Sequence, residues 1–172
     1  GAARSYDASV TNLAEPVLGV RTADCAPVLL FCTEPRAVGA VHAGWRGTLA
    51  GTVTSAVFSM QGAFGCRPAD LQAAIGPCIQ PCCYRVGEDV FQQFLDRFGS
   101  EAVSVLGEER FVHLAAVNRM WLVQCGLPAE HIDVLDLCTS CRQDLFFSHR
   151  REGGQAGRQL AYITLQQENP RG

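Results

Sequence analysis

The sequence predicts one α+β domain with mixed or antiparallel sheets and about three main helices. Segments with strand character and segments with helical periodicity follow one another without the strict strand–helix–strand alternation of doubly wound proteins. Two strand-like segments, Ala26–Cys32 and Ala37–His42, are separated by only four residues that include Pro35, which is typical of an antiparallel hairpin. The chain has 172 residues, of which 48% are apolar and 18% charged, so a single domain is expected over 1–172.

Each further element is predicted from its own local pattern. Apolar residues at helical spacing predict helices, and short β-rich runs predict strands. One helix should begin with the acids Glu88 and Asp89, carry Arg97 in its last turn and stop at Gly99. Helices are expected at 48–62, 86–98 and 114–125, and additional strands at 17–21, 71–75, 131–137 and 160–165.

Charge and composition narrow the functional classes. The formal net charge is −3, the isoelectric point is near 5.8 and no basic stripe is present, which argues against a nucleic-acid partner. No apolar run approaches the roughly 18 residues of a membrane span, and the N-terminus lacks the pattern of a secretory signal. The nine cysteines are odd in number, and Cys32 and Cys125 fall in apolar periodic segments. We therefore expect a cytoplasmic protein with reduced thiols and no disulfide framework.

Cys25 and His42 are predicted to share one functional site. They are 17 positions apart, and a chain reversal at 33–36 places position 25 opposite position 43 or 44 at the open end of the hairpin. Facing residues of a strand pair have Cβ atoms about 4.5–5.5 Å apart, and diagonal residues about 7–8 Å apart. Either separation lets a thiolate and an imidazole bind one zinc ion, and either lets His42 deprotonate Cys25 for nucleophilic attack. The spacing alone leaves both alternatives open.

The residues beside this pair suggest an anionic substrate. Arg46 lies where the chain enters a predicted helix, and Gly44 and Gly47 permit a close approach of the backbone. A helix N-terminus beside an arginine favours anions, and phosphate is the expected ligand. Asp24, next to Cys25, is expected to orient a ligand or to act as a base.

Two other segments carry candidate chemistry. Cys138-Thr-Ser-Cys141 has the spacing of a zinc knuckle, but the cysteines at 78, 82 and 83 supply no second C-x-x-C pair, so we do not expect a structural zinc there. The segment 146–151 (Phe-Phe-Ser-His-Arg-Arg) sets aromatic residues beside a cationic cluster. This pattern suggests a core anchor with an arginine that faces the substrate.

Four blocks of the sequence stand out together. They are Thr22-Ala23-Asp24-Cys25-Ala26-Pro27-Val28, Ala40-Val41-His42-Ala43-Gly44-Trp45-Arg46-Gly47, Ile75-Gly76-Pro77-Cys78-Ile79 and Phe146-Phe147-Ser148-His149-Arg150-Arg151. These blocks strongly resemble the YfiH family, also called the multicopper polyphenol oxidase or laccase-domain family. Matching sequence runs from about Asp7 to Leu165, and the cysteines at 138 and 141 ahead of the last block look most similar to the vertebrate laccase-domain proteins.

The resemblance implies a fold like that of the cysteine hydrolases and one zinc ion bound by His, Cys and His. Cys25 and His42 match two of these ligands, and the first histidine of the family would fall before residue 1. The chain also opens at Gly1 instead of a methionine. We therefore expect a fragment or processed form, truncated at its N-terminus, that binds zinc poorly or fills the third position with another ligand.

The activity implied by the resemblance is phosphorolysis of purine nucleosides, with adenosine deamination and methylthioadenosine cleavage alongside. The expected catalytic residues are Cys25, His42 and Asp24. The expected contacts to nucleoside and phosphate are Arg46, Gly76, Pro77, Ser148 and Arg150. The chain departs from the family after the aromatic residue Tyr84, where Arg85 stands in place of the usual glutamate.

Three alternatives to a zinc-dependent phosphorylase stay open. The laccase label implies copper, but one matched cysteine and one matched histidine are too few for a set of copper centres, so copper is the less favoured metal. A distant similarity to Cys/His deamidase toxins implies a metal-free hydrolase, with Cys25 as nucleophile and His42 as its base. A domain without its first metal ligand could instead be an inactive binding module. The preferred nucleoside and the oligomeric state are not predicted.

Overall fold

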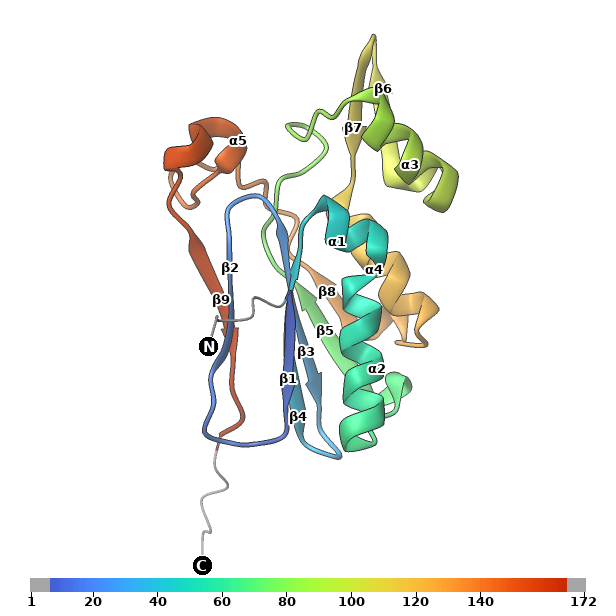
Figure 1. Ribbon diagram of the computed structural model, residues 1–172, viewed down its shortest axis with the longest axis vertical. Helices are drawn as coiled ribbons and strands as arrows, with labels where there is room; N and C mark the ends of the chain where they lie inside the picture. Colours follow the sequence, from blue (N-terminus) through green and yellow to red (C-terminus); the bar gives the residue numbers. More distant parts are fainter. Residues whose placement is uncertain (1–6, 167–172) are drawn as a thin grey trace, which may run out of the picture.

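A five-stranded mixed sheet forms the centre of the protein in this computed structural model, which describes residues 7–166 (Figure 1). In sheet order its strands are β1 (Ala8–Thr11), β4 (Ala37–Ala43), β3 (Ala26–Cys32), β5 (Leu71–Ile75) and β8 (Ile132–Val134). The first four run antiparallel to their neighbours, and β8 pairs with β5 in parallel. The predicted α+β class with mixed sheets is confirmed, whereas the expectation for the chain start at Gly1 lies outside the described residues.

The hairpin of β3 and β4 is buried from both sides. Helices α2 (Thr52–Phe64) and α4 (Leu114–Gln124) pack on one side of the sheet, and on the other side a ribbon of β2 (Leu18–Thr22) and β9 (Gln159–Ile163) contacts β3 and β4 (Figure 1). No residue of β3 or β4 is exposed. Because both faces are covered, apolar side chains run continuously along these strands in place of the alternation of a half-exposed strand.

The predicted chain reversal at 33–36 is confirmed, and it fixes the register of the hairpin. Ala26 pairs with Ala43 and Pro27 with His42, so position 25 lies opposite position 44. This end of the hairpin is where the candidate site forms. The opposite end holds the reversal itself.

The first predicted helix, at 48–62, is two helices in the structure. Gly51 separates α1 (Trp45–Ala50) from α2, and its φ of +75° lies in the left-handed region that glycine adopts without strain. The Gly51 N–H donates to the Thr48 carbonyl at 3.2 Å and ends α1 as a helix C-cap does. The prediction treated the apolar stripe as continuous and did not weigh this glycine as a stop. The first of the two helices, α1, follows β4 almost directly and carries Trp45 and Arg46 in its first turn.

The other two predicted helices are confirmed as α3 (Glu88–Phe98) and α4, with Gly99 as the stop of α3. The prediction missed the hairpin that follows, made of β6 (Val103–Leu106) and β7 (Glu109–Val112). This hairpin packs with α3 and the start of α4 into a second buried cluster centred on Phe94. Its strands are only four residues long and join at Gly107, so each apolar run is too short to be distinctive.

The remaining chain is largely irregular and returns to the site end of the sheet. The predicted strand at 131–137 is shortened to β8, since only three of its residues pair with β5. The one-turn helix α5 (His149–Glu152) was not predicted, and short 3₁₀ turns occupy Pro68–Asp70, Ser100–Ala102, Ala129–His131 and Gly153–Gln155. Across residues 7–166, no helix has both the length and the apolar character needed to cross a membrane.

Candidate functional site

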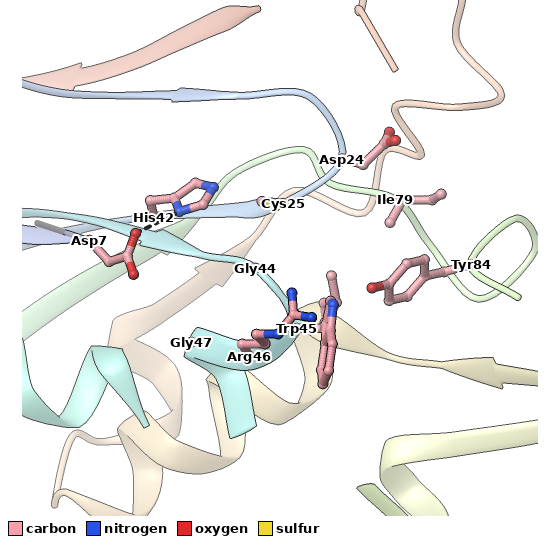
Figure 2. Close-up of a pocket in the computed structure, with 11 residues that line it drawn as sticks. Asp7, Asp24, Cys25, His42, Gly44, Trp45, Arg46, Gly47, Ile79 and Tyr84 are labelled. Atoms are coloured by element: carbon pink, nitrogen blue, oxygen red, sulfur yellow. Dashed lines mark hydrogen bonds and ion pairs between the residues drawn. The ribbon is translucent and has the colours of Figure 1, made fainter. Parts of the chain in front are cut away.

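A cavity of about 240 Å³ opens at the end of the β3–β4 hairpin, slightly smaller than the roughly 300 Å³ at which the usual range of ligand pockets begins (Figure 2). Its wall is built by the turn before β3, the end of β4, the start of α1, the loop between β5 and α3, and the start of α4. The residues that line it are Asp7, Asp24, Cys25, His42, Gly44, Trp45, Arg46, Gly47, Ile79, Tyr84 and Leu114. Four of the residues predicted from the sequence, Asp24, Cys25, His42 and Arg46, therefore meet in one pocket.

Cys25 and His42 lie diagonally across the hairpin, with Gly44 between them. Cys25 is opposite Gly44, and His42 is one pair further along. A Cβ atom placed on Gly44 would sit 3.1 Å from the Cys25 sulfur and 3.8 Å from Cε1 of His42. The absence of a side chain at position 44 thus keeps open the space that the thiol and the imidazole share.

Asp7 holds His42 in place, and sequence reasoning missed it. The Asp7 carboxylate lies 3.1 Å from Nδ1 of His42, and the Asp7 carbonyl accepts the His42 backbone N–H at 2.7 Å (Figure 2). When Nδ1 carries the proton that Asp7 accepts, Nε2 is left as an electron-pair donor for a metal or as a base. The four sequence blocks that resemble the family all lie after Asp7. A single aspartate ahead of a strand that was not predicted carries no pattern that indicates a functional residue.

The Cys25 thiol is not activated by its surroundings. Burial raises its pKa, the negative charges of Asp24 and Asp7 raise it further, and Arg158 opposes them. Among the described residues, no hydrogen bond joins the Cys25 thiol to the His42 imidazole. A thiol in this environment stays protonated at neutral pH unless a metal ion displaces its proton.

The far side of the pocket is apolar and aromatic. Trp45 and Tyr84 project toward the same space, with Ile79 beside Tyr84 (Figure 2). Leu114 also lines the pocket. Burial, together with the nearby Cys25, raises the pKa of Tyr84 to about 12, so its hydroxyl is a neutral hydrogen-bond donor at neutral pH. The sequence did not identify Ile79 and Leu114 as pocket residues, because an apolar residue that lines a pocket looks like any core residue. Both also belong to the second buried cluster.

Arg46 supplies the positive charge of the pocket. Its guanidinium stacks on the Trp45 ring at 4.2 Å from the centroid. Within residues 7–166 it forms no ion pair, so its charge is available to an anionic ligand. The predicted contribution of a helix dipole is small, because α1 has only six residues.

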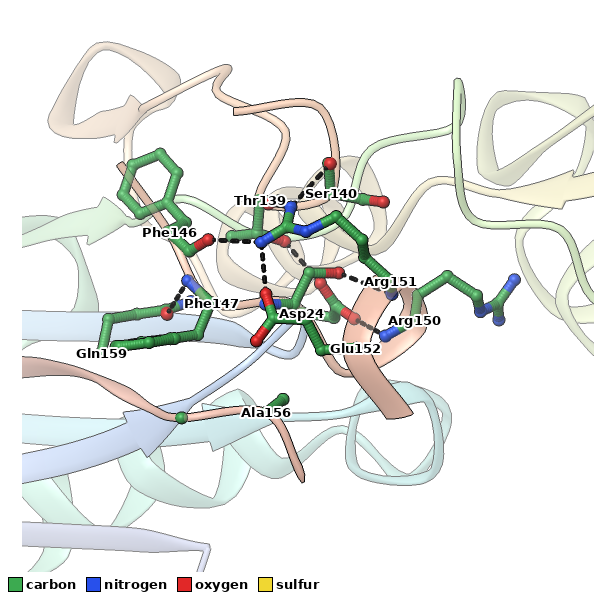
Figure 3. Close-up of polar contacts among 12 residues, drawn as sticks. Asp24, Thr139, Ser140, Phe146, Phe147, Arg150, Arg151, Glu152, Ala156 and Gln159 are labelled. Carbon is green, nitrogen blue, oxygen red and sulfur yellow. Dashed lines mark hydrogen bonds and ion pairs between the residues drawn. The ribbon is translucent and has the colours of Figure 1, made fainter. Parts of the chain in front are cut away.

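Asp24 is a structural hub on the pocket wall (Figure 3). It is 7% exposed and adopts a φ of +87°, the one positive φ of a non-glycine residue among residues 7–166. One carboxylate oxygen accepts the Thr139 hydroxyl at 2.7 Å, and the other accepts the Arg150 backbone N–H at 2.6 Å. Asp24 thereby ties the start of β3 to the C-terminal segment.

The other predicted contact residues surround the pocket without lining it. The Gly76 N–H donates to the Pro27 carbonyl at 2.8 Å, and neither Gly76 nor Pro77 reaches the cavity. Ser148 is fully buried, and its hydroxyl caps α5 by accepting the Arg151 N–H. These residues shape the frame of the site.

Arg150 does not line the cavity either. Its guanidinium donates to the Arg85 carbonyl at 2.6 Å and stacks on Tyr84 at 5.2 Å. Arg85, the departure from the family pattern, pairs with Glu109 on β7 at 2.9 Å and does not line the pocket. Arg150 therefore acts on the site through the Tyr84 wall.

A second group of thiols lies beside this loop. Cys82, Cys83, Cys138 and Cys141 place their sulfur atoms within 4.8 Å of one another, a set that could hold a metal ion. The sequence prediction rejected such a site because it looked only for a second C-x-x-C pair. The fold supplies the partners as the adjacent cysteines 82 and 83, which reach the knuckle from the loop between β5 and α3.

Comparison with known proteins places this arrangement in a family. The sequence pattern of the family described as "Multi-copper polyphenol oxidoreductase laccase" matches residues 2–166. The chain is 37% identical to the "Purine nucleoside phosphorylase YlmD" of Geobacillus stearothermophilus over 94% of its own length and 61% of the relative's. It is 37% identical to an "Adenosine deaminase RL5" from an unknown prokaryotic organism, over 94% of its own length and 63% of the relative's.

A human protein and a solved structure are also similar. The chain is 30% identical to the human "Purine nucleoside phosphorylase LACC1" over 95% of its own length and 39% of the relative's. The crystal structure of YlmD from G. stearothermophilus superposes with a TM-score of 0.89 at 35% identity, covering 95% of this chain and 62% of that one. The chain thus spans about three fifths of the length of the bacterial relatives it matches.

Proposed function

Because the chain belongs to the family of multi-copper polyphenol oxidoreductase laccases, we propose that its pocket is the site of a zinc-dependent purine nucleoside phosphorylase. Two relatives bear that activity in their names, and the third is named as an adenosine deaminase. A purine nucleoside and phosphate are the proposed substrates.

The observation that carries the proposal is the division of the pocket into two chemically different halves. One half is aromatic and apolar, formed by Trp45, Ile79, Tyr84 and Leu114. The other half holds the Cys25 thiol and the His42 imidazole, and the cation of Arg46 lies at the boundary, stacked on the Trp45 ring. A purine base suits the first half through stacking, and the ribose and phosphate suit the second.

The donor atoms on the polar side fit zinc. A cysteine sulfur and a histidine nitrogen are common ligands of zinc, and the carboxylate of Asp7 behind His42 is the usual partner of a metal-bound imidazole. Cys25 and His42 would hold the ion, and zinc when bound supplies a Lewis acid for a substrate oxygen. One thiol and one imidazole do not make the several centres of a multicopper oxidase, so copper is the less favoured metal.

The remaining roles follow from the placement of each side chain. In phosphorolysis a phosphate oxygen forms a bond to C1′ of the ribose and the bond from C1′ to the purine nitrogen breaks. The purine leaves with the electron pair and takes up, by way of water, the proton that the phosphate loses. Arg46 holds the phosphate against C1′. The neutral hydroxyl of Tyr84 donates a hydrogen bond to the charge that develops on the leaving purine.

Asp24 is assigned a positioning role. Both of its carboxylate oxygens already accept hydrogen bonds, from Thr139 and from Arg150. It fixes the turn that presents Cys25 and tethers the segment that carries Arg150. Direct proton transfer by Asp24, the role expected from the sequence, would require one of these bonds to break.

A metal-free Cys/His hydrolase is the second candidate, because all three groups of such a site line the pocket. Cys25 would be the nucleophile, His42 its base, and Asp7 the residue that orients the base. The raised pKa of Cys25 argues against it, since an activated cysteine has a lowered pKa. A strong chelator separates the candidates: loss of turnover supports the metal enzyme. Turnover that survives chelation and is abolished by alkylation of Cys25 supports the hydrolase.

The test of the proposal uses inosine, adenosine and methylthioadenosine with inorganic phosphate and the zinc-loaded protein. We expect release of free base together with ribose 1-phosphate, or its methylthio analogue, and loss of product in His42→Ala. Ammonia release from adenosine is measured in the same reactions, because deamination is a proposed side activity. Absence of base and ammonia at every zinc level, with a stable protein partner recovered, would contradict the enzyme and support a binding module.

A further inference from the structure

Four cysteines outside the pocket converge from two distant segments of the chain. Cys82 and Cys83 lie in the loop between β5 and α3, and Cys138 and Cys141 lie between β8 and α5. The segments are joined by a backbone bridge, in which the Thr139 N–H donates to the Cys78 carbonyl at 3.1 Å. Core packing does not explain the cluster, because Cys82 and Cys141 are exposed.

The spacing of the sulfur atoms is close to that of a tetrahedral metal site. A zinc–sulfur bond of about 2.3 Å places the sulfurs of a regular tetrahedron about 3.8 Å apart. The sulfur of Cys141 is 3.6 Å from that of Cys82 and 3.4 Å from that of Cys83, and all four lie within 4.8 Å of one another. Changes of about 1 Å or less in the sulfur–sulfur distances would bring the four thiolates into coordination.

The backbone around Cys138 is arranged as in a metal-binding knuckle. The Gln80 N–H points at the Cys138 sulfur at 3.5 Å, and the Arg142 N–H donates to the Cys138 carbonyl at 3.0 Å, which closes the turn. The Gln80 N–H stabilises the Cys138 sulfur when that sulfur carries negative charge. This N–H group is oriented toward the sulfur before any metal arrives.

Two arginines of α5 contact the backbone of these two segments. Arg151 donates to the carbonyls of Thr139 at 3.0 Å and Ser140 at 2.8 Å, inside the knuckle (Figure 3). Arg150 donates to the Arg85 carbonyl, and its Nη1 lies 3.5 Å from the Cys83 carbonyl. Four thiolates around a divalent ion carry a net charge of about −2. Arg151 is paired with Glu152 at 2.5 Å, so the guanidinium of Arg150 supplies the positive charge that offsets it.

We propose that Cys82, Cys83, Cys138 and Cys141 bind one structural zinc ion, separate from the metal site of the pocket. Binding releases the four thiol protons and forms four zinc–sulfur bonds, with no change of oxidation state. Four protein ligands close the coordination sphere, so the ion holds structure and takes no substrate.

The site would fix the wall of the pocket. Cys83 directly precedes Tyr84, which lines the cavity, and Thr139 within the knuckle donates to Asp24. A zinc ion that clamps the two segments therefore sets the position of Tyr84 and supports the turn before Cys25. This role does not depend on the reaction that the pocket performs.

The test measures bound zinc per chain in the reduced protein and in three variants. His42→Ala removes a ligand of the pocket and should retain one zinc ion, whose X-ray absorption shows four sulfur neighbours at about 2.3 Å. Cys141→Ser changes an exposed residue of the cluster and should lose one equivalent relative to wild type. Cys125→Ser, a half-buried cysteine outside the cluster, is the matched control and should lose none.

A measurement on the unmodified chain keeps the proposal testable if a variant does not fold. Zinc should protect the four cluster cysteines from alkylation, as read by mass spectrometry. Equal zinc content in Cys141→Ser and wild type, or nitrogen and oxygen neighbours around the zinc of His42→Ala, would overturn the proposal. A disulfide between Cys141 and Cys82 or Cys83 that forms in the presence of zinc would also overturn it.

Discussion

Gly44→Ala should damage the pocket without damaging the fold. The φ and ψ of Gly44 are −73° and 175°, which alanine also adopts, so no backbone strain is introduced. The new Cβ would lie 3.1 Å from the Cys25 sulfur, shorter than the ordinary contact of about 3.5–4.0 Å. The thiol must therefore move by a few tenths of an ångström, or His42 must turn away.

The two consequences have different sizes. Gly44 is the N-cap of α1, where alanine is less favourable by roughly 0.5–1 kcal/mol, partly offset by a stiffer unfolded chain. For a chain of this length, the midpoint of thermal unfolding should fall by no more than about 4 °C. Zinc affinity and phosphorolysis should fall by about tenfold or more, because the added methyl group occupies the space between the thiol and the imidazole in which the ion would sit.

Gly87→Ala is the matched control. Gly87 is the N-cap of α3, with φ −73° and ψ 164°, and an added Cβ there meets only the mobile end of the Asp89 side chain. Both variants are measured by thermal unfolding, zinc competition titration and base release from inosine. The reasoning is refuted if Gly44→Ala binds zinc and turns over within about twofold of wild type, or if both variants lose activity equally.

Three further outcomes are expected. Asp7→Asn should weaken zinc binding about 10–100-fold in a competition titration, because the partner of the His42 Nδ1 is weakened; unchanged affinity would show that Asp7 does not orient the ring. Asp24→Asn should lower the free energy of unfolding, measured by urea denaturation, by about 1.5–3 kcal/mol, since a buried charged acceptor of two hydrogen bonds is lost. The control Asp133→Asn changes an exposed residue and should alter the free energy of unfolding by less than about 0.5 kcal/mol. In the metal-free protein, the rate of alkylation of Cys25 should rise with pH, with a midpoint above the ordinary thiol pKa of about 8.5. Burial and the charge of Asp24 raise the pKa of Cys25, and the reactive thiolate forms only above that pKa. A midpoint below that of the urea-unfolded chain would contradict the raised pKa.

The part of the site built by local geometry could be predicted from the sequence. A short reversal between two β-rich runs fixes which residues face each other, and this placed Cys25 opposite position 44 beside His42. The four family blocks then identified the region, and Asp24 and Arg46 came with them. The α+β class followed from the order of elements.

The parts that depend on distant contacts could not be predicted. Asp7 reaches His42 because β1 pairs with β4, and β1 has only four residues with no distinctive pattern. Cys82 and Cys83 meet Cys141 across 59 and 58 positions of sequence separation, which no spacing rule covers. The positions of Gly76 and Arg150 outside the cavity lining could not be predicted for a related reason: a sequence block shows that residues belong to one region, but not which of them face the cavity.

The central claim is that a zinc ion held by Cys25 and His42 serves phosphorolysis in this pocket. It is tested most directly by titrating the metal-free protein with zinc while base and ribose 1-phosphate are measured from inosine and phosphate, in wild type and in His42→Ala. We predict that products appear in wild type as the pocket fills, and that His42→Ala yields none although it still binds zinc at the four cysteines. Equal product formation in both proteins, or product formation in wild type before any zinc is added and in the presence of chelator, would contradict the account.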